Sequence, residues 1–317
     1  MSLHRMSPSV ISLPITPNLA QLQKPDFCKL MSNIETIIMD IDGVLWIDDK
    51  PIPHSVDVVN KLKEKGIQII LYTNNSTRNS EEFLNKATNM GFLVDRNDII
   101  TTATLVVSYL KQYKFDKKIY LVGSRGLAEE LELAGYRHLG IGPDVLEHSL
   151  VQTVENFQPD PNVGAVVVGY DAHFCYTKLL KAASYLNKPE CHFLATTADE
   201  CCLVNPDIVF PGTGPILKAI EAASQREAIV LGKPYSHALE ALKIAKSIDP
   251  KKTMIIGDRT TTDIFFGNRS GFITVLVLSG ATEESIFEKK RSCRRNLRDF
   301  VPDYYLDTLG ELDRNLS

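Results

Sequence analysis

Short apolar runs recur along the chain from Ile34 onward, and stretches with helical spacing of apolar and polar positions separate them. The runs carry β-branched and other apolar residues on consecutive positions, which is typical of parallel strands buried on both faces. They are Ile34–Met39, Ile67–Tyr72, Ile119–Val122, Ala165–Gly169, His192–Ala195, Ala228–Leu231, Thr253–Ile256 and Thr274–Leu278. We predict a strand at each of them.

The intervening stretches predict helices. Ser55–Lys65, Lys178–Leu186 and Gly214–Ala223 place apolar residues three and four positions apart, and Gly66 follows the first as a stop signal. Strand and helix alternate throughout, so the pattern predicts an α/β fold with a Rossmann-like, mainly parallel sheet.

Polar residues follow four of the predicted strands at their carboxyl ends. Asp40 follows the first, Thr73-Asn74-Asn75 the second, and Lys233 and Asp258 follow later ones. Ligands of open α/β sheets bind outside the carboxyl ends of the strands, where all four groups can converge. We therefore predict a functional site at this edge.

The same residues divide the chain. Residues 115–226 have their own alternation of strands and helices but none of these polar groups, so they are predicted to form an α/β insertion. Residues 30–114 and 227–317 then form the catalytic core. Residues 1–29 are expected to be a disordered tail. Residues 1–25 hold Pro, Ser and Thr with no acidic residue before Asp26, as in a transit peptide, but Arg5 and Lys24 are too few for the Arg-rich type.

Two carboxylates, Asp40 and Asp42, stand one residue apart directly after a fully apolar strand. Carboxylates in such a place are costly unless they bind a cation or do chemistry. A surface turn at Gly43 is the alternative, although it does not explain the apolar strand. A third carboxylate, Asp258, also ends a strand and suits Mg²⁺, whereas Asp263 could support a metal or cap a helix.

Uncharged polar groups and a lysine complete the predicted site. The hydroxyl of Thr73 and the amides of Asn74 and Asn75 can hydrogen-bond phosphate oxygens, although Asn-Asn-Ser is also a common loop composition. Lys233 lies in a tight Gly-Lys-Pro turn, where its charge can neutralise a phosphate and an aspartate together.

Charge and composition exclude several function classes. A net charge of −4 in 317 residues, with the one basic cluster at Lys289–Arg298, gives no support for a nucleic-acid partner. No run of eighteen apolar residues indicates a membrane span. Six cysteines without metal-ligand spacing or a secretory signal favour a reducing compartment, and we expect a cytoplasmic protein.

With these segments together, the chain resembles the haloacid dehalogenase superfamily. Its motifs are matched by Asp40-Ile41-Asp42, Thr73, Lys233 and Gly257-Asp258 with Asp263. The elements Asp-Gly-Val-Leu-Trp, Thr-Asn-Asn-Ser, Gly-Lys-Pro and Gly-Asp-Arg are similar to the p-nitrophenyl phosphatase branch, which includes phosphoglycolate (glycerol-3-phosphate) and pyridoxal phosphate phosphatases. The resemblance covers about residues 30–310 and implies that the insertion is a cap domain over the substrate.

The resemblance also implies residue roles. Asp40 would be the nucleophile that forms an aspartyl-phosphate, and Asp42 the general acid and base. Mg²⁺ would be bound by the side chains of Asp40 and Asp258 and by the backbone carbonyl of Asp42, with Asp263 supporting its hydration shell. An aspartate with the ordinary pKa of about 3.9 is ionised at neutral pH and needs no base to attack phosphorus, so we expect Asp40 to be ionised.

The remaining roles concern the substrate. Thr73 and Asn74 would bind the phosphoryl oxygens, and Lys233 would bridge the phosphate and the nucleophile. The expected substrate is a small phosphorylated metabolite, 2-phosphoglycolate or glycerol 3-phosphate, with pyridoxal phosphate or phosphotyrosine as alternatives. A catalytically silent binding protein is a further alternative, and a homodimer through the cap is expected from the family.

Three positions depart from the family pattern. Thr261 stands where the branch usually has a carboxylate or amide, which we expect to alter metal affinity. Thr197 replaces an asparagine in the cap loop, and Cys202 replaces a histidine of the pyridoxal phosphatase. The adjacent Cys201 and Cys202 also raise a redox hypothesis, with ordinary loop or packing thiols as the alternative.

Overall fold

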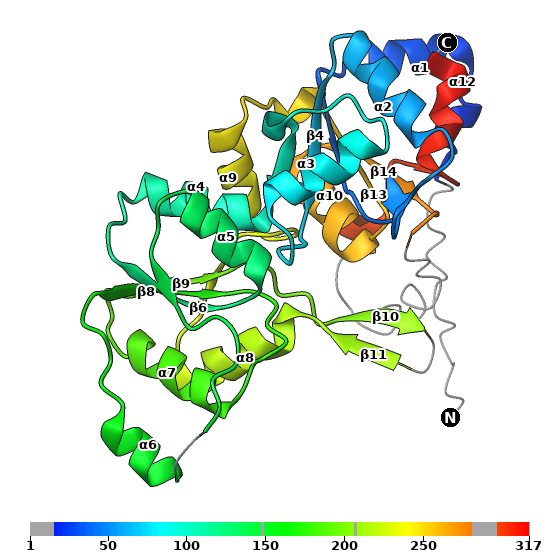
Figure 1. Cartoon of the computed structure of the whole chain (residues 1–317). Coiled ribbons are helices and arrows are strands. Elements are labelled where there is room, and N and C mark those ends of the chain that lie inside the picture. The colour runs from blue at the N-terminus through cyan, green and yellow to red at the C-terminus, as the bar shows by residue number, and fades with distance from the viewer. Residues whose placement is uncertain (1–15, 147–148, 206–207, 281–296, 317) are drawn as a thin grey trace, which may run out of the picture.

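The computed structural model describes residues 16–146, 149–205, 208–280 and 297–316, and it contains two parallel sheets with helices on their faces (Figure 1). The first sheet has six strands in the order β15-β14-β13-β1-β4-β5, all paired in parallel. Their bounds are β1 Thr36–Met39, β4 Gln68–Thr73, β5 Ile99–Thr101, β13 Thr253–Gly257, β14 Ile273–Val277 and β15 Tyr304–Leu306.

Alternate side chains of β1 enter two different apolar clusters, as the period of two along a strand requires. Ile37 and Met39 pack in a cluster with side chains of α1, α2 and α3, whereas Ile38 packs with side chains of α4, α9 and α10. These helices are α1 Lys24–Met31, α2 Ser55–Glu64, α3 Ser80–Asn89, α4 Thr102–Gln112, α9 Ser236–Ala245 and α10 Phe265–Ser270. The first sheet is therefore covered on both faces.

The second sheet has five strands in the order β12-β9-β8-β6-β7, again all parallel. Helices α4 and α5 lie on one face and α7 and α8 on the other (Figure 1). The bounds are β6 Lys118–Val122, β7 His138–Leu139, β8 Val163–Val168, β9 His192–Ala195, β12 Ile229–Val230, α5 Arg125–Leu133, α6 Leu150–Asn156, α7 Tyr176–Leu186 and α8 Thr213–Ser224. Ala165 and Val167 of β8 join the same cluster as Ile38 of β1, so apolar packing is continuous between the two sheets.

Two hairpins and several short helices complete the fold. Hairpin β2–β3 (Trp46–Ile47 and Lys50–Pro51) follows the first strand, and β10–β11 (Cys201–Asn205 and Ile208–Pro211) projects from the second sheet (Figure 1). The short helices are η1 Leu19–Gln21, η2 Arg96–Asp98, η3 Pro250–Lys252, the π-helical η4 Thr260–Ile264, η5 Leu297–Phe300, η6 Leu309–Leu312 and α12 Asp313–Leu316. Within the described residues, no helix is long and apolar enough to cross a membrane.

The fold confirms the predicted α/β class and every predicted strand to within two residues at each end. The prediction of a tail over residues 1–29 is wrong for residues 16–29. Leu19 and Phe27 are 0% and 3% exposed because η1 and α1 pack on the first sheet, and residues 1–15 lie outside the described part of the chain.

The boundary placed at residue 227 is also wrong by a few residues. Strand β12 was assigned to the core, yet it pairs with β9 and is the edge strand of the second sheet. Lys233 therefore follows a strand of the second sheet, so residues of both sheets assemble the site.

Candidate active site

The predicted polar residues meet where the two sheets face each other. Asp40 and Asp42 follow β1, Thr73 ends β4, and Asp258 follows β13, so three neighbouring strands of the first sheet contribute. Lys233 approaches from β12 of the second sheet. A cavity of about 250 Å³ lies between them, and it is lined by Asp40, Asp42, Thr73, Asn74, Asn75, Ser76, Thr77, Tyr170, Thr197, Asp199, Phe210, Gly212, Thr213, Lys233, Arg259 and Thr262.

Lys233 is fixed by contacts on several sides. Its side chain is 1% exposed, and Nζ lies 2.6 Å from Asp263 Oδ1 and 3.2 Å from Asp40 Oδ1. The same nitrogen donates to the carbonyl oxygen of Tyr72 at 2.9 Å and lies 4.8 Å from the centre of the Tyr72 ring. Burial alone lowers the pKa of Lys233, but the carboxylates of Asp263 and Asp40 outweigh it and raise the pKa above its ordinary value. The lysine is therefore a permanent cation beside Asp40.

Asp40 has an environment that the sequence argument did not foresee. Burial raises the pKa of its carboxyl from 3.8 to about 8; Lys233 opposes this shift, whereas the neighbouring charges of Asp263 and Asp258 add to it. The ordinary pKa assumed from the sequence is therefore wrong for the metal-free site. Asp40 needs more positive charge than one lysine supplies to be fully ionised at neutral pH.

Three carboxylates form a candidate cation site. Oxygen atoms of Asp40, Asp258 and Asp263 lie within 4.8 Å of one another, and Asp258 and Asp263 are buried. Carboxylate oxygens are the ligands that Mg²⁺ prefers, and an excess of negative charge at a buried place favours a divalent cation. The donor set fits the predicted metal.

Gly43 explains how Asp258 reaches this place. Its backbone has φ of +84°, and a Cβ at this residue would lie 2.5 Å from Asp258 Oδ2. Only glycine allows both the turn after Asp42 and the close approach of the carboxylate.

Asp263 lies in the first turn of η4 and also pairs with Lys233. Its Oδ1 accepts from Lys233 Nζ, and its Oδ2 accepts from the backbone nitrogen of Arg259 at 3.2 Å and from Thr262 Oγ1 at 3.3 Å. Both interpretations left open by the sequence have a counterpart here. Oδ2 accepts from the backbone nitrogen of Arg259, the N-cap of η4, while Oδ1 pairs with Lys233 and oxygens of Asp263 belong to the carboxylate cluster.

Asp42 differs from the other aspartates because its residue is exposed. Its Oδ1 accepts a hydrogen bond from Trp46 Nε1 at 2.8 Å, and the backbone nitrogen of Gly43 donates to the carbonyl of Trp46 at 2.8 Å. The Asp42 carboxylate is thus fixed by the indole of Trp46 and is not one of the three clustered carboxylates.

Asn74 connects the two sheets. Its Oδ1 accepts from the backbone nitrogen of Lys233 and its Nδ2 donates to the carbonyl oxygen of Lys233, both at 2.9 Å. Nδ2 also lies 3.3 Å from Thr197 Oγ1 and 3.3 Å from Asp199 Oδ2 in the cap loop. The side chain predicted to bind phosphate thus positions the lysine, while Asn75 accepts from Thr77 within its own loop.

Comparison with known proteins identifies the family of this chain. A haloacid dehalogenase-like hydrolase model matches residues 37–137, and a second model of the same kind, described as HAD hydrolase-like, matches residues 230–312. The 4-nitrophenylphosphatase of Schizosaccharomyces pombe is 35% identical over 90% of this chain and 96% of its own. The chain belongs to the haloacid dehalogenase-like hydrolase family.

Other relatives of this haloacid dehalogenase-like hydrolase are also phosphatases. The glycerol-3-phosphate phosphatase of Rattus norvegicus is 32% identical over 89% of this chain and 91% of its own, and phosphoglycolate phosphatase 1A of Arabidopsis thaliana is 33% identical over 94% and 82%. The p-nitrophenyl phosphatase structure from Archaeoglobus fulgidus has a TM-score of 0.72 at 29% identity and covers 89% of this chain and 98% of its own. This hydrolase is accordingly a phosphoric monoester hydrolase, as predicted.

Sequence reasoning missed part of the cavity wall. Tyr170 and Phe210 line it with their rings stacked at a centroid distance of 5.4 Å, and Arg259 and Thr262 line it from the loop after β13. Phe210 belongs to hairpin β10–β11, which was not predicted. The apolar run Ile208-Val209-Phe210 was the signal that could have shown this strand.

The three departures have different positions in the structure. Thr261 is half-buried in the π-helical turn, next to the cavity-lining Thr262, and Thr197 lines the cavity and contacts Asn74. Cys201 and Cys202 lie in β10, but their side chains are outside the described part of the chain, as are Cys293 and most of the basic cluster at 289–298. The redox hypothesis therefore stays a prediction.

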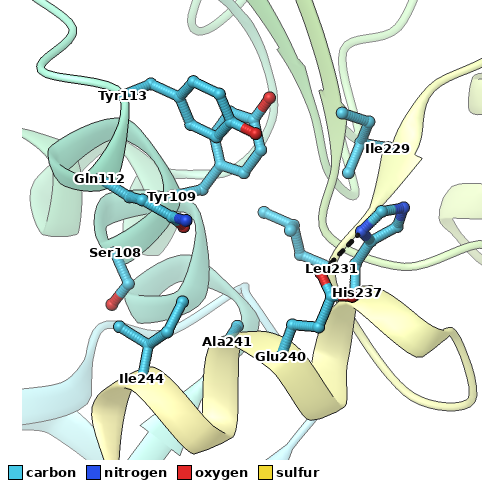
Figure 2. A pocket seen from close by; sticks show the side chains of 10 residues that line it. All are labelled: Ser108, Tyr109, Gln112, Tyr113, Ile229, Leu231, His237, Glu240, Ala241 and Ile244. Atoms are coloured by element: carbon cyan, nitrogen blue, oxygen red, sulfur yellow. Dashed lines mark ion pairs between the residues drawn. The ribbon is translucent and has the colours of Figure 1, made fainter.

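A second, smaller cavity of about 100 Å³ lies between α4 and α9 (Figure 2). The rings of Tyr109 and Tyr113 form one wall, and His237 and Glu240, whose nearest charged atoms are 3.6 Å apart, lie at the other. None of its lining residues lines the larger cavity, and none of the predicted site residues lines the smaller one.

Proposed function

We propose that this hydrolase is a Mg²⁺-dependent phosphatase that forms an aspartyl-phosphate on Asp40 and acts on a small phosphorylated metabolite. The observation that supports this most is the grouping of Asp40 with Lys233 at 3.2 Å and with Asp258 and Asp263 in one carboxylate cluster. A proposed nucleophile, a cation and candidate metal ligands are brought together there by three separate segments of the chain, those after β1, β12 and β13.

In this mechanism an oxygen of Asp40 attacks the phosphorus atom, and the bond from phosphorus to the leaving oxygen breaks with its electrons staying on that oxygen. Lys233 lies beside the attacking carboxylate and neutralises charge on the transferring phosphoryl group. Its contacts with Asp263 and Tyr72 fix the ammonium before substrate binds, so little reorganisation is needed.

Asp42 transfers protons in both halves of the reaction. It gives a proton to the leaving oxygen, and it then takes a proton from the water that attacks the aspartyl-phosphate and regenerates Asp40. Its exposure and its place in the cavity wall suit contact with both the leaving group and water.

Mg²⁺ would be bound by the carboxylates of Asp40 and Asp258, with the backbone carbonyl of Asp42 as a further ligand and Asp263 nearby. When bound, it supplies positive charge that keeps Asp40 ionised and neutralises phosphoryl oxygens. The raised pKa of Asp40 in the metal-free site supports this part of the proposal.

The proposed substrate is 2-phosphoglycolate or glycerol 3-phosphate, because the cavity is small and relatives that act on these esters match most of the chain. A second candidate is a phosphate ester with an aromatic leaving group, such as pyridoxal phosphate or phosphotyrosine, which the stacked Tyr170–Phe210 wall favours. A steady-state comparison of these esters separates the candidates, and a clear preference for an aromatic ester would reject the first. The cap-mediated homodimer and the cytoplasmic location stay predictions.

Asp40→Asn tests the mechanism. We expect Mg²⁺-dependent phosphate release to fall by on the order of 10³-fold or more, since an amide is a poor nucleophile. Asp49→Asn is the matched control, because Asp49 is 90% exposed and contacts only Lys86 among the described residues. Unchanged turnover in Asp40→Asn, with the protein folded and the control active, would reject Asp40 as the nucleophile.

A further inference from the structure

Trp46 is not one of the proposed catalytic residues, but it contacts one of them, Asp42. Its side chain is fully buried at 0% exposure, with the Phe92 ring edge-on at a centroid distance of 6.0 Å and Lys86 Nζ 4.9 Å from the indole centre. The rotamer of Trp46 is therefore fixed by packing.

A buried indole has one polar atom, the N–H, and leaving it without an acceptor is costly. In this structure the acceptor is Asp42 Oδ1, at 2.8 Å. The carboxylate itself belongs to an exposed residue at the cavity, where a free side chain would sample several rotamers. The hydrogen bond from the buried indole N–H therefore holds the Asp42 carboxylate in one orientation.

We propose that Trp46 is a positioning residue for Asp42 and determines which carboxyl oxygen handles the proton. A carboxyl oxygen that already accepts a hydrogen bond from a fixed N–H is less available to carry a proton than the other oxygen. Oδ1 is occupied in this way, so Oδ2 carries the proton. The proposal rests on the function proposed above, in which Asp42 is the acid and base.

The proton steps then follow atom by atom. As the bond from phosphorus to the leaving oxygen breaks, the proton on Oδ2 moves to that oxygen, and the electrons of the O–H bond stay on Asp42. Water then attacks the aspartyl-phosphate, its proton moves to Oδ2, and the electrons of the bond from phosphorus to Asp40 stay on Asp40. Trp46 Nε1 keeps its own proton throughout, so it can donate to Oδ1 in both states of Asp42.

The first test is spectroscopic and does not depend on activity. The chain has a single tryptophan, so one indole N–H resonance in a ¹H–¹⁵N spectrum of the ¹⁵N-labelled protein belongs to Trp46 without further assignment. In Asp42→Ala we expect this proton to shift upfield and to exchange faster with water, because a charge-assisted hydrogen bond is lost. Asp199→Asn, which changes another carboxylate of the cavity wall, is the control and should leave the resonance in place.

The second test uses Trp46→Phe, which keeps a buried aromatic ring and removes the N–H. Departure of 4-nitrophenolate needs little protonation, whereas departure of an alkoxide needs a proton. We expect kcat/KM for glycerol 3-phosphate to fall about 10-fold or more, part of the roughly 10²–10⁴-fold that a positioned acid supplies, and kcat/KM for 4-nitrophenyl phosphate to change about 3-fold or less. Phe27→Leu is the matched control, because Phe27 belongs to the same apolar cluster but lies in α1 and is not part of the packing around the Trp46 ring described above, so it should affect both esters alike.

The outcomes separate the two proposals. An indole resonance that ignores Asp42→Ala, or a Trp46→Phe enzyme that loses activity equally on both esters, overturns the role of Trp46. If the wild-type protein hydrolyses neither ester but the indole resonance still shifts in Asp42→Ala, the phosphatase mechanism is overturned. The contact between Trp46 and Asp42 is then structural and has no catalytic role.

Discussion

Replacing Lys233 by methionine is expected to destabilise the protein and to inactivate it for the same electrostatic reason. Lys233 and Asp263 are 1% and 0% exposed and lie 2.6 Å apart, so the substitution leaves Asp263 buried without its cation. Removing one partner of a buried ion pair costs about 3–5 kcal/mol. At roughly 2–4 °C per kcal/mol, the melting temperature should fall by about 6–20 °C.

The stabilisation that Lys233 contributes depends on pH in a defined way. The pKa of Lys233 is raised above its ordinary value of 10.5, so its stabilising contribution is complete below that value and is lost only as the pH rises through the raised pKa. Urea and thermal unfolding at pH 7, with chelator present so that metal binding does not contribute, therefore measure the full loss. The kcat with Mg²⁺ should fall by about 10²–10³-fold, as for loss of one preorganised donor.

Two further variants make this reasoning refutable. Lys181→Met removes a partly exposed partner from a pair with Asp144 at 2.8 Å, and it should cost only about 0–1 kcal/mol. Lys233→Met/Asp263→Asn removes the stranded charge and should recover at least half of the stability but none of the activity. A Lys233→Met protein no less stable than Lys181→Met, or a double variant as unstable as the single one, would refute the unpaired-charge argument.

Two other predictions concern the same site. Because burial raises the pKa of Asp40 from 3.8 to about 8, its contribution to stability is complete below 3.8 and is lost as the pH rises through about 8. The metal-free protein should lose stability to urea across that window and Mg²⁺ should restore most at the upper end, whereas a Mg²⁺ effect independent of pH would contradict binding by Asp40. Asn74→Ala should cost about 1–3 kcal/mol, since it leaves buried backbone groups of Lys233 without partners, and should lower kcat by up to about 10²-fold. Asn75→Ala, whose side chain contacts only its own loop among the described residues, is the stability control, and equal unfolding free energies for the two variants would contradict the role of Asn74.

The sequence correctly predicted the strands whose apolar run is visible within a few consecutive residues. A strand such as Thr253–Gly257 is buried on every position, so its apolar run predicts it without knowledge of its neighbours. Ile99–Thr101 and Tyr304–Leu306 were missed because three residues at a sheet edge give too short a run. The tail was misjudged because Leu19 and Phe27 are single apolar residues whose burial depends on distant partners.

In the candidate site as well, the sequence predicted what depends on local pattern and missed what depends on tertiary packing. The order of Asp40, Thr73, Lys233 and Asp258 along the chain predicted which residues meet, since each follows a strand. The sequence could not show that β12 pairs in the second sheet, because pairing partners are set by tertiary packing. Nor could it show that the Asn74 amide bonds to Lys233, which is 159 residues away, or that burial changes the pKa of Asp40.

Lys233 follows a strand of the second sheet but pairs with carboxylates of the first, so the site joins the two sheets. Asp40, the proposed nucleophile, and two other carboxylates come from the first sheet, and the lysine that lies against them comes from the end of β12. Asn74 joins the two sides through Lys233, Thr197 and Asp199, and one apolar cluster is continuous between the sheets. The second sheet therefore does more than form a wall of the cavity, because undocking it would leave three acidic groups without their lysine. Stability of the domain interface and ionisation of the nucleophile are thus set by the same contacts, and a substitution that loosens the interface near Asn74 should change catalysis before it unfolds either sheet.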